Sequence, residues 1–427
     1  MKKIYILFLF AFCFKSQLFS QTPKVYINLN SHNEASGTST VVGQGELDYD
    51  NATQRKYYDT AFKYIKQVSD MVVAKNVKYN FQSDVKFLFG CLKWDLKGSS
   101  TSGKNLLKWM DDLSNIECDP HSHEAKYPSF GAFGKIYNYA DVAHLHDSLG
   151  VTNRKNVGGF KVDGLQNQTN WSTMEAGLQG KAYSTSGMWQ PNVLWGGSYK
   201  AGVHNDMNFF GSFKPTLDTN NYATYSSNVN QRLRIQGNGC SMVFHDTTNE
   251  QRLIREYRKL FSNVHYGVYS PNEFYTPVLQ INCRDIYKAN YVSRLTKIID
   301  SINTYVTLGW VEWRTISEKD SIWRSVKYNT ANKRTDCSAL PTGIDEKYIQ
   351  NALAIYPNPV SDILIVAHTI EIKSVTLIDA LGKINFYESN IKSERREVNT
   401  ESLNPGLYFV SVTLNDDKTV TRKFLKE

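Results

Sequence analysis

Short apolar segments alternate with segments of helical periodicity through most of the chain. Residues 25–30 are mainly β-branched, aromatic and amide residues, which favours a strand, and residues 55–75 carry apolar side chains at three- and four-residue spacing, which predicts an amphipathic helix. The same alternation returns over residues 241–314. Strands that alternate with helices predict a parallel sheet covered by helices, either a barrel or a doubly wound sheet.

Two further parts of the chain differ from this pattern. Residues 166–238 are mostly loop-like and rich in Gly, Asn, Ser and Trp, and we expect this long irregular segment to cover the open face of the sheet or barrel. Residues 329–343 are polar and predict a linker. From residue 344 to 427 short strands follow one another at regular spacing, which predicts a small all-β sandwich.

The N-terminus has the pattern of a secretory signal peptide. Lys2 and Lys3 precede an apolar run over residues 4–14, which is too short to span a membrane, so we expect residues 1–20 to be removed on export. No later stretch reaches about 18 unbroken apolar residues, so no transmembrane segment is expected. The formal charge of +8 is spread along the chain without a dense basic run, which argues against a nucleic-acid partner.

Candidate functional residues follow two predicted strands. Side chains alternate between the two faces of an extended chain, so Asp119, His121 and His123 point the same way, and so do His32 and Glu34 after the first strand. In an α/β barrel the chemistry sits at the strand ends, under the loops that follow them. We therefore expect these two segments to share one site.

The last part of the chain resembles a known secretion domain. Residues 356–359 read Tyr-Pro-Asn-Pro, residues 375–382 form a strand that ends in Leu-Gly, residues 405–410 read Pro-Gly-Leu-Tyr-Phe-Val, and Lys423-Phe424 follow. In order and spacing these pieces resemble the C-terminal sorting domain of the type IX secretion system. The resemblance implies recognition by that secretion machinery and export across the outer membrane, to the cell surface or the medium.

Residues 21–328 resemble the polysaccharide-deacetylase-like and glycoside-hydrolase-like (β/α)7 barrel group. The resemblance is carried by five segments: His32 with Glu34, residues 119–124, residues 138–141, residues 195–196 and residues 204–206. It implies a (β/α)7-type barrel with a long irregular insertion and a carbohydrate substrate. True deacetylases of the group carry paired aspartates on the first strand and two histidines separated by three residues; this chain has Ser-His-Asn-Glu and His-Ser-His at those places.

The candidate chemistry is metal-dependent hydrolysis. We expect His121 and His123 to bind a divalent metal with His32, or else Asp119, as the third ligand, zinc being the expected ion, with a coordination position left for water. A metal lowers the pKa of such a water and polarises a carbonyl, as removal of an acyl group from a glycan requires. The expected catalytic residues are Glu34 as general base, Asp119, and either His204 or Asp206 as the acid for the leaving group.

Two other functions are open at this point. A metal-free glycosidase would use two of the carboxylates Glu34, Asp119 and Glu124. A non-catalytic surface protein that binds glycans on a hydrolase fold would need none of these groups for turnover. The tryptophans at 171, 189 and 195 could stack on sugar rings or pack in the interior.

Overall fold

The structure is a computed structural model, and the account below concerns the residues that it describes: 24–33, 52–95, 97–122, 135–152, 156–158, 171–196, 209–217, 225–237, 239, 242–270, 273–282, 285–325, 334–336, 353–415 and 417–427. The helices are α1 (Ala52–Ala74), α2 (Val85–Trp94), η1 (Ser99–Thr101), α3 (Leu106–Asp111), α4 (Tyr139–Ser148), α5 (Trp171–Ala176), α6 (Glu250–His265), α7 (Tyr291–Thr307) and α8 (Ile316–Ser325). The strands of the larger part are β1 (Val25–Asn33), β2 (Tyr79–Ser83), β3 (Ile116–Pro120), β4 (Asn156–Val157), β5 (Val193–Trp195), β6 (Phe209–Phe213), β7 (Arg234–Gln236), β8 (Met242–Phe244), β9 (Val278–Asn282), β10 (Val311–Trp313) and β11 (Arg334–Asp336).

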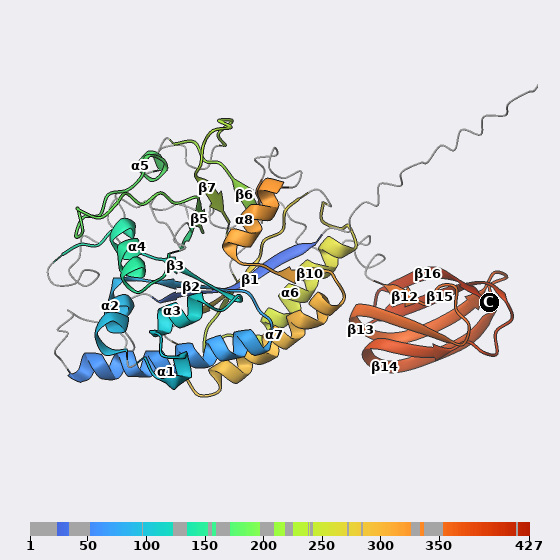
Figure 1. The fold of residues 1–427 in the computed structure, drawn as a ribbon. Coiled ribbons are helices and arrows are strands. Elements are labelled where there is room, and N and C mark those ends of the chain that lie inside the picture. The colour runs from blue at the N-terminus through green and yellow to red at the C-terminus, as the bar shows by residue number, and fades with distance from the viewer. Residues whose placement is uncertain are drawn as a thin grey trace, which may run out of the picture.

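A parallel sheet with β1 at its centre organises the larger part. Its strand order is β3-β2-β1-β9-β8, and β10 pairs with the first residues of β1. The register places Asn30 of β1 opposite Asn80 of β2, and His32 opposite Gln82. Figure 1 shows α1, α6 and α7 on one side of this sheet, and α8 with β5, β6 and β7 on the other.

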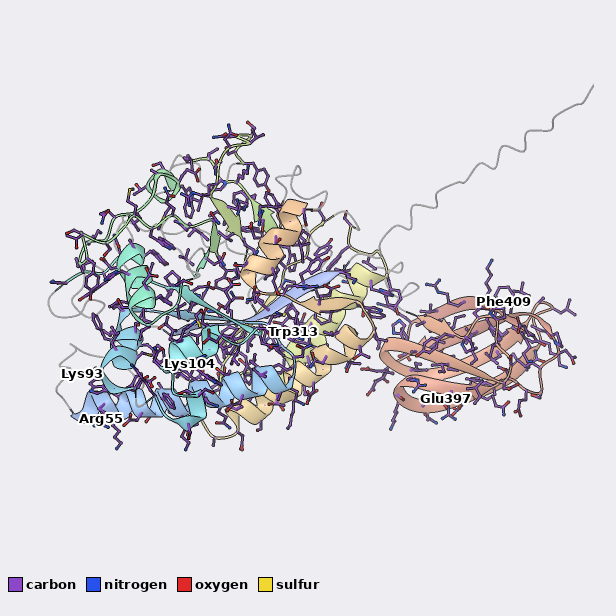
Figure 2. The ribbon with its side chains drawn as sticks, viewed as in Figure 1. Arg55, Lys93, Lys104, Trp313, Glu397 and Phe409 are labelled. Carbon is purple, nitrogen blue, oxygen red and sulfur yellow. The ribbon has the colours of Figure 1, made fainter. Side chains whose placement is uncertain are left out.

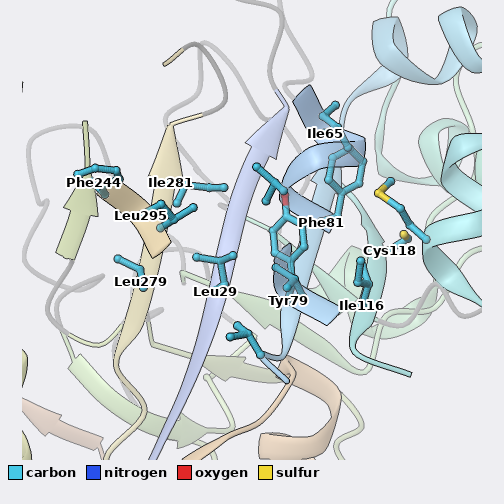
Figure 3. Packing of buried hydrophobic residues seen from close by; sticks show 14 of the residues in the cluster. Leu29, Ile65, Tyr79, Phe81, Ile116, Cys118, Phe244, Leu279, Ile281 and Leu295 are labelled. Carbon is cyan, nitrogen blue, oxygen red and sulfur yellow. The ribbon is translucent and has the colours of Figure 1, made fainter. Parts of the chain in front are cut away.

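The face of the sheet toward α1 and α7 is apolar. Leu29 of β1 is flanked by Tyr79 of β2 and Leu279 of β9, and these side chains pack with Ile65 of α1 and Leu295 of α7 (Figure 3). Several charged side chains lie on the outer surface, as Arg55 of α1, Lys93 of α2 and Lys104 before α3 do in Figure 2. Burial of this apolar layer is the main driving force for folding of the domain.

The opposite face of the sheet borders an interior shared with a second sheet. The second sheet has the order β11-β6-β7-β5-β4, and β4, β5 and β7 are parallel in it. Side chains of β3 and β4 join the two sheets, because the Asn156 amide donates a hydrogen bond to Glu117. The strands thus surround a common interior, and the predicted α/β class, with helices outside and a parallel sheet inside, is confirmed.

Several elements lie where the residue pattern carries no clear signal for them. The apolar run at residues 85–94 is a helix, capped by the Asp84 side chain on the backbone N–H of Lys86. The irregular region 166–238 includes α5, β5, β6 and β7 in its described parts, and β11 lies inside the expected linker and pairs with β6. Helix α8 was not predicted.

The C-terminal part is a small all-β domain, as predicted. It consists of the antiparallel strands β12 (Ala354–Tyr356), β13 (Ile363–Asp379), β14 (Ile384–Asn399), β15 (Gly406–Leu414) and β16 (Thr419–Lys426) in the order β12-β13-β15-β16, with β14 on the other edge of β13. Strand β13 is long, and register shifts interrupt its pairing with β14 after Ala367, after Ile372 and after Leu377. These irregularities bend β13 and let its two halves share one buried core.

The two parts of the chain touch at the end of α6. Tyr266 and Val268 pack against the core of the β domain, and Arg258 forms an ion pair with Glu394 of β14. Among the described helices none is both long and apolar enough to cross a membrane.

Candidate functional site

Two histidines from neighbouring strand ends lie face to face. His32 is the next-to-last residue of β1. His121 follows β3 directly and is fully buried. Their rings are stacked, with centroids 4.3 Å apart and planes inclined by 23°. The ring of Trp195, from β5, is nearly perpendicular to the ring of His32, with the two centroids 5.3 Å apart. Strands of both sheets therefore contribute to one cluster of rings.

Gly158 fixes the orientation of His121. Nδ1 of His121 lies 3.2 Å from the carbonyl oxygen of Gly158, and the Tyr139 hydroxyl donates a hydrogen bond of 2.8 Å to the same oxygen. With its proton on Nδ1 the imidazole presents Nε2 as an acceptor. A methyl group at position 158 would lie 1.9 Å from Oε1 of Gln82 and 2.9 Å from Nε2 of His32, so this position requires glycine.

The start of α4 holds Tyr139 in place. Asn138 and Asp141 form a reciprocal capping box at the helix N-terminus. The Asp141 carboxylate also accepts hydrogen bonds from the backbone N–H groups of Lys181, Ala182 and Tyr183, at 3.0, 3.0 and 2.8 Å. Residues 138–141 therefore act structurally, by anchoring the loop beside the site and directing Tyr139 to Gly158.

Asp119 lies in the interior on β3, two residues before His121, and is fully buried. Its Oδ2 accepts a hydrogen bond of 2.9 Å from the Asn80 amide. Burial raises the pKa of the Asp119 carboxyl well above its usual value, the charge of Glu117 raises it further, and the hydrogen bond from Asn80 opposes both effects. A raised pKa at a buried carboxyl near a histidine pair is a feature of functional sites.

A second layer of polar groups lies beneath Asp119. Glu117 accepts hydrogen bonds from Asn156 and, at 3.0 Å, from Ser317, and burial raises the pKa of its carboxyl. Lys319 of α8 is fully buried and donates a 2.6 Å hydrogen bond to Oδ1 of Asn28. Burial lowers the pKa of the Lys319 amine to about 7, against the opposing charge of Glu117. The interior thus contains two carboxyls and an amine, all withdrawn from water.

The structure brings two of the predicted site residues into contact, the stacked rings of His32 and His121. Asp119 is buried on β3 and accepts a hydrogen bond from Asn80, and its place in a shared site stays a prediction. Glu34, His123, Glu124, His204 and Asp206 lie outside the described residues. The three tryptophans at 171, 189 and 195 are exposed by 1%, 6% and 1%, so they pack in the interior and form no sugar platform.

Several residues of the site were not predicted from the sequence. Asn80, Gln82 and Glu117 lie on strands whose alternation would place them inward, so the signal existed for them. Gly158 and Lys319 carried no local signal, because their roles depend on contacts with distant strands.

The described residues supply part of a metal site. His32 and His121 offer two imidazoles side by side, and His121 is held through Nδ1 by a backbone carbonyl, as metal-binding histidines usually are. Within the described ranges no three His, Cys, Asp or Glu side chains group closely enough to hold a metal ion. The described part of the site thus offers two imidazole ligands, fewer than the three protein ligands of a typical catalytic zinc site.

The C-terminal part matches a known family. Residues 354–427 match the family described as the secretion system C-terminal sorting domain, which confirms the resemblance seen in the sequence. The chain therefore carries the sorting signal for export across the outer membrane by the type IX secretion system. The match covers the β12–β16 domain and leaves the chemistry of the larger part open.

Solved structures show weaker likenesses. The chain is similar to a probable polysaccharide deacetylase from Pseudomonas aeruginosa PAO1, with 9% identity over 72% of this chain and 93% of that one, at a TM-score of 0.44. The allantoinase Puue has 8% identity over 72% and 93%, at a TM-score of 0.43. The chain spans 14% of PorZ, a surface component of the type IX secretion system of Porphyromonas gingivalis, with 19% identity over 23% of this chain and a TM-score of 0.17. No curated protein matches the sequence. TM-scores this low leave the chemistry to be argued from the residues themselves.

Proposed function

We propose that this chain is an exported carbohydrate-active hydrolase that removes an acyl group from a glycan with the help of a bound divalent metal. The observation that supports the proposal is the stacked pair His32 and His121 at the ends of parallel strands, with the buried Asp119 two residues before His121 on β3. Two imidazoles and a carboxyl of raised pKa at strand ends are the groups that metal-assisted hydrolysis needs.

Each residue has a defined role in this proposal. His32 and His121 hold the metal together with His123, and zinc suits such imidazole ligands. The metal, when bound, polarises the acyl carbonyl and lowers the pKa of a water. Glu34 takes the proton of the attacking water, and His204 or Asp206 donates a proton to the departing sugar oxygen or nitrogen. Asp119 orients the ligand set from below, and the Gly158 carbonyl keeps His121 in one orientation.

Metal content of the full chain tests the proposal. We expect about one zinc or similar ion per chain after incubation with zinc, as a three-histidine site would hold. The variants His32→Ala and His121→Ala should lose it, and His144→Ala, a histidine on α4 whose ring packs against Tyr183, should keep it. The metal-loaded wild type should release acetate from acetylated oligosaccharides. A wild type that binds no metal at all would contradict the proposal.

A second candidate is a non-catalytic protein that binds glycans at the cell surface. It is favoured by the lack of a three-ligand group within the described part of the chain. This candidate predicts that oligosaccharide binding survives in His121→Ala and that the wild type shows no turnover.

A third candidate is a metal-free glycosidase. It predicts turnover without metal, and loss of that turnover when Asp119 is replaced.

A further inference from the structure

Helix α8 inserts one amine into the interior beneath the site. Lys319 is fully buried, while the next residue, Asp320, forms a two-point ion pair with Arg234 of β7 at 2.5 and 2.8 Å. Asp320 and Arg234 side chains are exposed by only 5% and 9%, so this pair fixes the position of α8 against the second sheet. The amine is thereby directed at the central strand β1 of the first sheet.

A continuous chain of hydrogen bonds runs from this amine to Asp119. Lys319 Nζ donates to Asn28 Oδ1 at 2.6 Å, Asn28 Nδ2 donates to Asn80 Oδ1 at 3.1 Å, and Asn80 Nδ2 donates to Asp119 Oδ2 at 2.9 Å. All four side chains are fully buried. Every bond in the chain runs in the same direction, from α8 toward the site.

The direction of the chain is imposed by groups of α8. Nζ of Lys319 donates to the oxygen of the Asn28 amide, and this turns the NH2 group of Asn28 toward Asn80. The backbone N–H of Ile316, the first residue of α8, donates to the same Asn80 oxygen at 3.1 Å. Both donors therefore hold the Asn80 oxygen on the side of α8, and the Asn80 NH2 must face Asp119.

We propose that Lys319 is a positioning residue, which acts through Asn28 and Asn80 to present a hydrogen-bond donor to Asp119 and so hold that carboxyl in one orientation beneath His121. The proposal rests on the proposed hydrolase function for its catalytic consequence, because a carboxyl free to rotate would no longer orient the ligand histidines. The ordering of the amides themselves is independent of that function.

The first experiment observes the amides in the full chain, without a substrate. The protein is prepared with isotopically labelled asparagine, and its side-chain NH2 groups are observed by NMR. The signals of Asn80 are identified by their loss in Asn80→Ser. Lys319→Met keeps the volume of the side chain and removes the donor, and it should shift the Asn80 signals. The control is Lys78→Met. Lys78 pairs at 2.9 Å with Glu318, which lies in α8 beside Lys319, and loss of this cation should leave the Asn80 signals unchanged. Unchanged Asn80 signals in Lys319→Met would overturn the proposal.

The second experiment is a double-mutant cycle on turnover, with acetate release from an acetylated oligosaccharide as readout. Lys319→Met and Asn28→Ala should each lower kcat by about 10- to 100-fold with little change in KM, as loss of a supporting hydrogen bond commonly does. The double variant should lose no more than either single one, because both act along one chain. If the kcat losses of the two single variants add up in the double variant, and follow the decrease in the thermal unfolding midpoints, the role of Lys319 is merely structural. A wild type without turnover refutes the hydrolase, and the amide signals then decide the positioning role alone.

Discussion

At the scale of single residues, successive positions of β1 lie in opposite environments. Ile27 and Leu29 pack against the helices, whereas Asn28, Asn30 and His32 face the shared interior. Both amide atoms of Asn30 are buried and have no hydrogen-bond partner among the described residues, which is uncommon for a buried polar group. The polar interior therefore differs from the branched aliphatic layers that usually fill parallel barrels.

Replacement of Gly158 by alanine tests how closely the side chains around this residue are packed. Gly158→Ala places a methyl group against Gln82 and His32, so we expect a loss of roughly 1–3 kcal/mol in the free energy of unfolding, together with loss of metal binding. Gly187→Ala is the matched control, because a methyl group there meets nothing within 4 Å. Equal unfolding midpoints for the two variants would show that position 158 has more space than the structure indicates.

The buried amine of Lys319 predicts a pH dependence of stability. Its pKa is lowered from 10.5 to about 7 in the folded chain, so between these values the unfolded chain holds more protons. Rising pH therefore stabilises the folded state, by roughly 1.4 kcal/mol for each unit crossed in this window. Glu117 is the charged group that opposes the shift. Urea titrations at pH 7 and pH 10 should show this rise in the wild type and its absence in Lys319→Met.

The sequence predicted the site as far as local periodicity reaches. Alternation along two strands predicted that His32 shares a face with Asn28 and Asn30, and Asp119 with His121. In the structure the ends of these two strands meet through the rings of His32 and His121. The same rule, applied one step further back, would have found Glu117. No pattern within α8 could identify Lys319, because the partner of its amine is 291 positions away in the chain.

At the scale of elements, α8 is the part whose structure depends most on tertiary contacts. It is short, its sequence mixes polar and apolar residues, and it carries two buried charged side chains, Lys319 and Asp320. Such a helix gains little from intrinsic propensity and is stabilised mainly by its packing. The long helices α1 and α7 were predictable because their apolar residues repeat at helical spacing, whereas α8 lacks a comparable repeat.

The ion pair between Arg234 and Asp320 joins α8 to β7, and each buried charge depends on the other. Arg234→Met leaves a carboxylate buried beside β7 with only the half-exposed Arg324 as partner, so we expect a loss of roughly 3 kcal/mol in stability. Arg234→Met combined with Asp320→Leu removes both charges and should recover most of that loss. Chemical denaturation of the three proteins measures both effects. A double variant less stable than Arg234→Met would contradict this account of the pair.

At the scale of the whole molecule, the chain contains separate hydrophobic cores in its two main parts. Among the described residues, the side chains of the larger part that pack against the core of the β12–β16 domain are the partly buried Tyr266 and Val268. The ion pair between Arg258 and Glu394 is partly exposed, so it contributes less than about 1 kcal/mol. The two parts therefore fold as units with little mutual stabilisation.

Removal of residues 354–427 tests this independence together with the sorting role. We expect calorimetry of the full chain to show two unfolding transitions and the shortened chain to keep one of them, shifted by no more than a few degrees. In the producing cell the shortened chain should fail to reach the outside, because the matched sorting domain is missing. A single cooperative transition in the full chain would contradict the independence, and normal export of the shortened chain would contradict the sorting role.

The two faces of the central sheet separate folding from chemistry. The apolar side chains that stabilise the fold lie between the strands and the outer helices, and the amides, carboxyls and imidazoles lie on the inner face, at alternate positions of the same strands. Because the inner-face groups are joined by buried hydrogen bonds, as Asn28 and Asn80 are, a single substitution there leaves its partner without that bond and lowers stability. Coordinated changes at bonded positions would leave the packing outside unaltered. We therefore expect the inner face to change in evolution as sets of bonded residues, not one residue at a time.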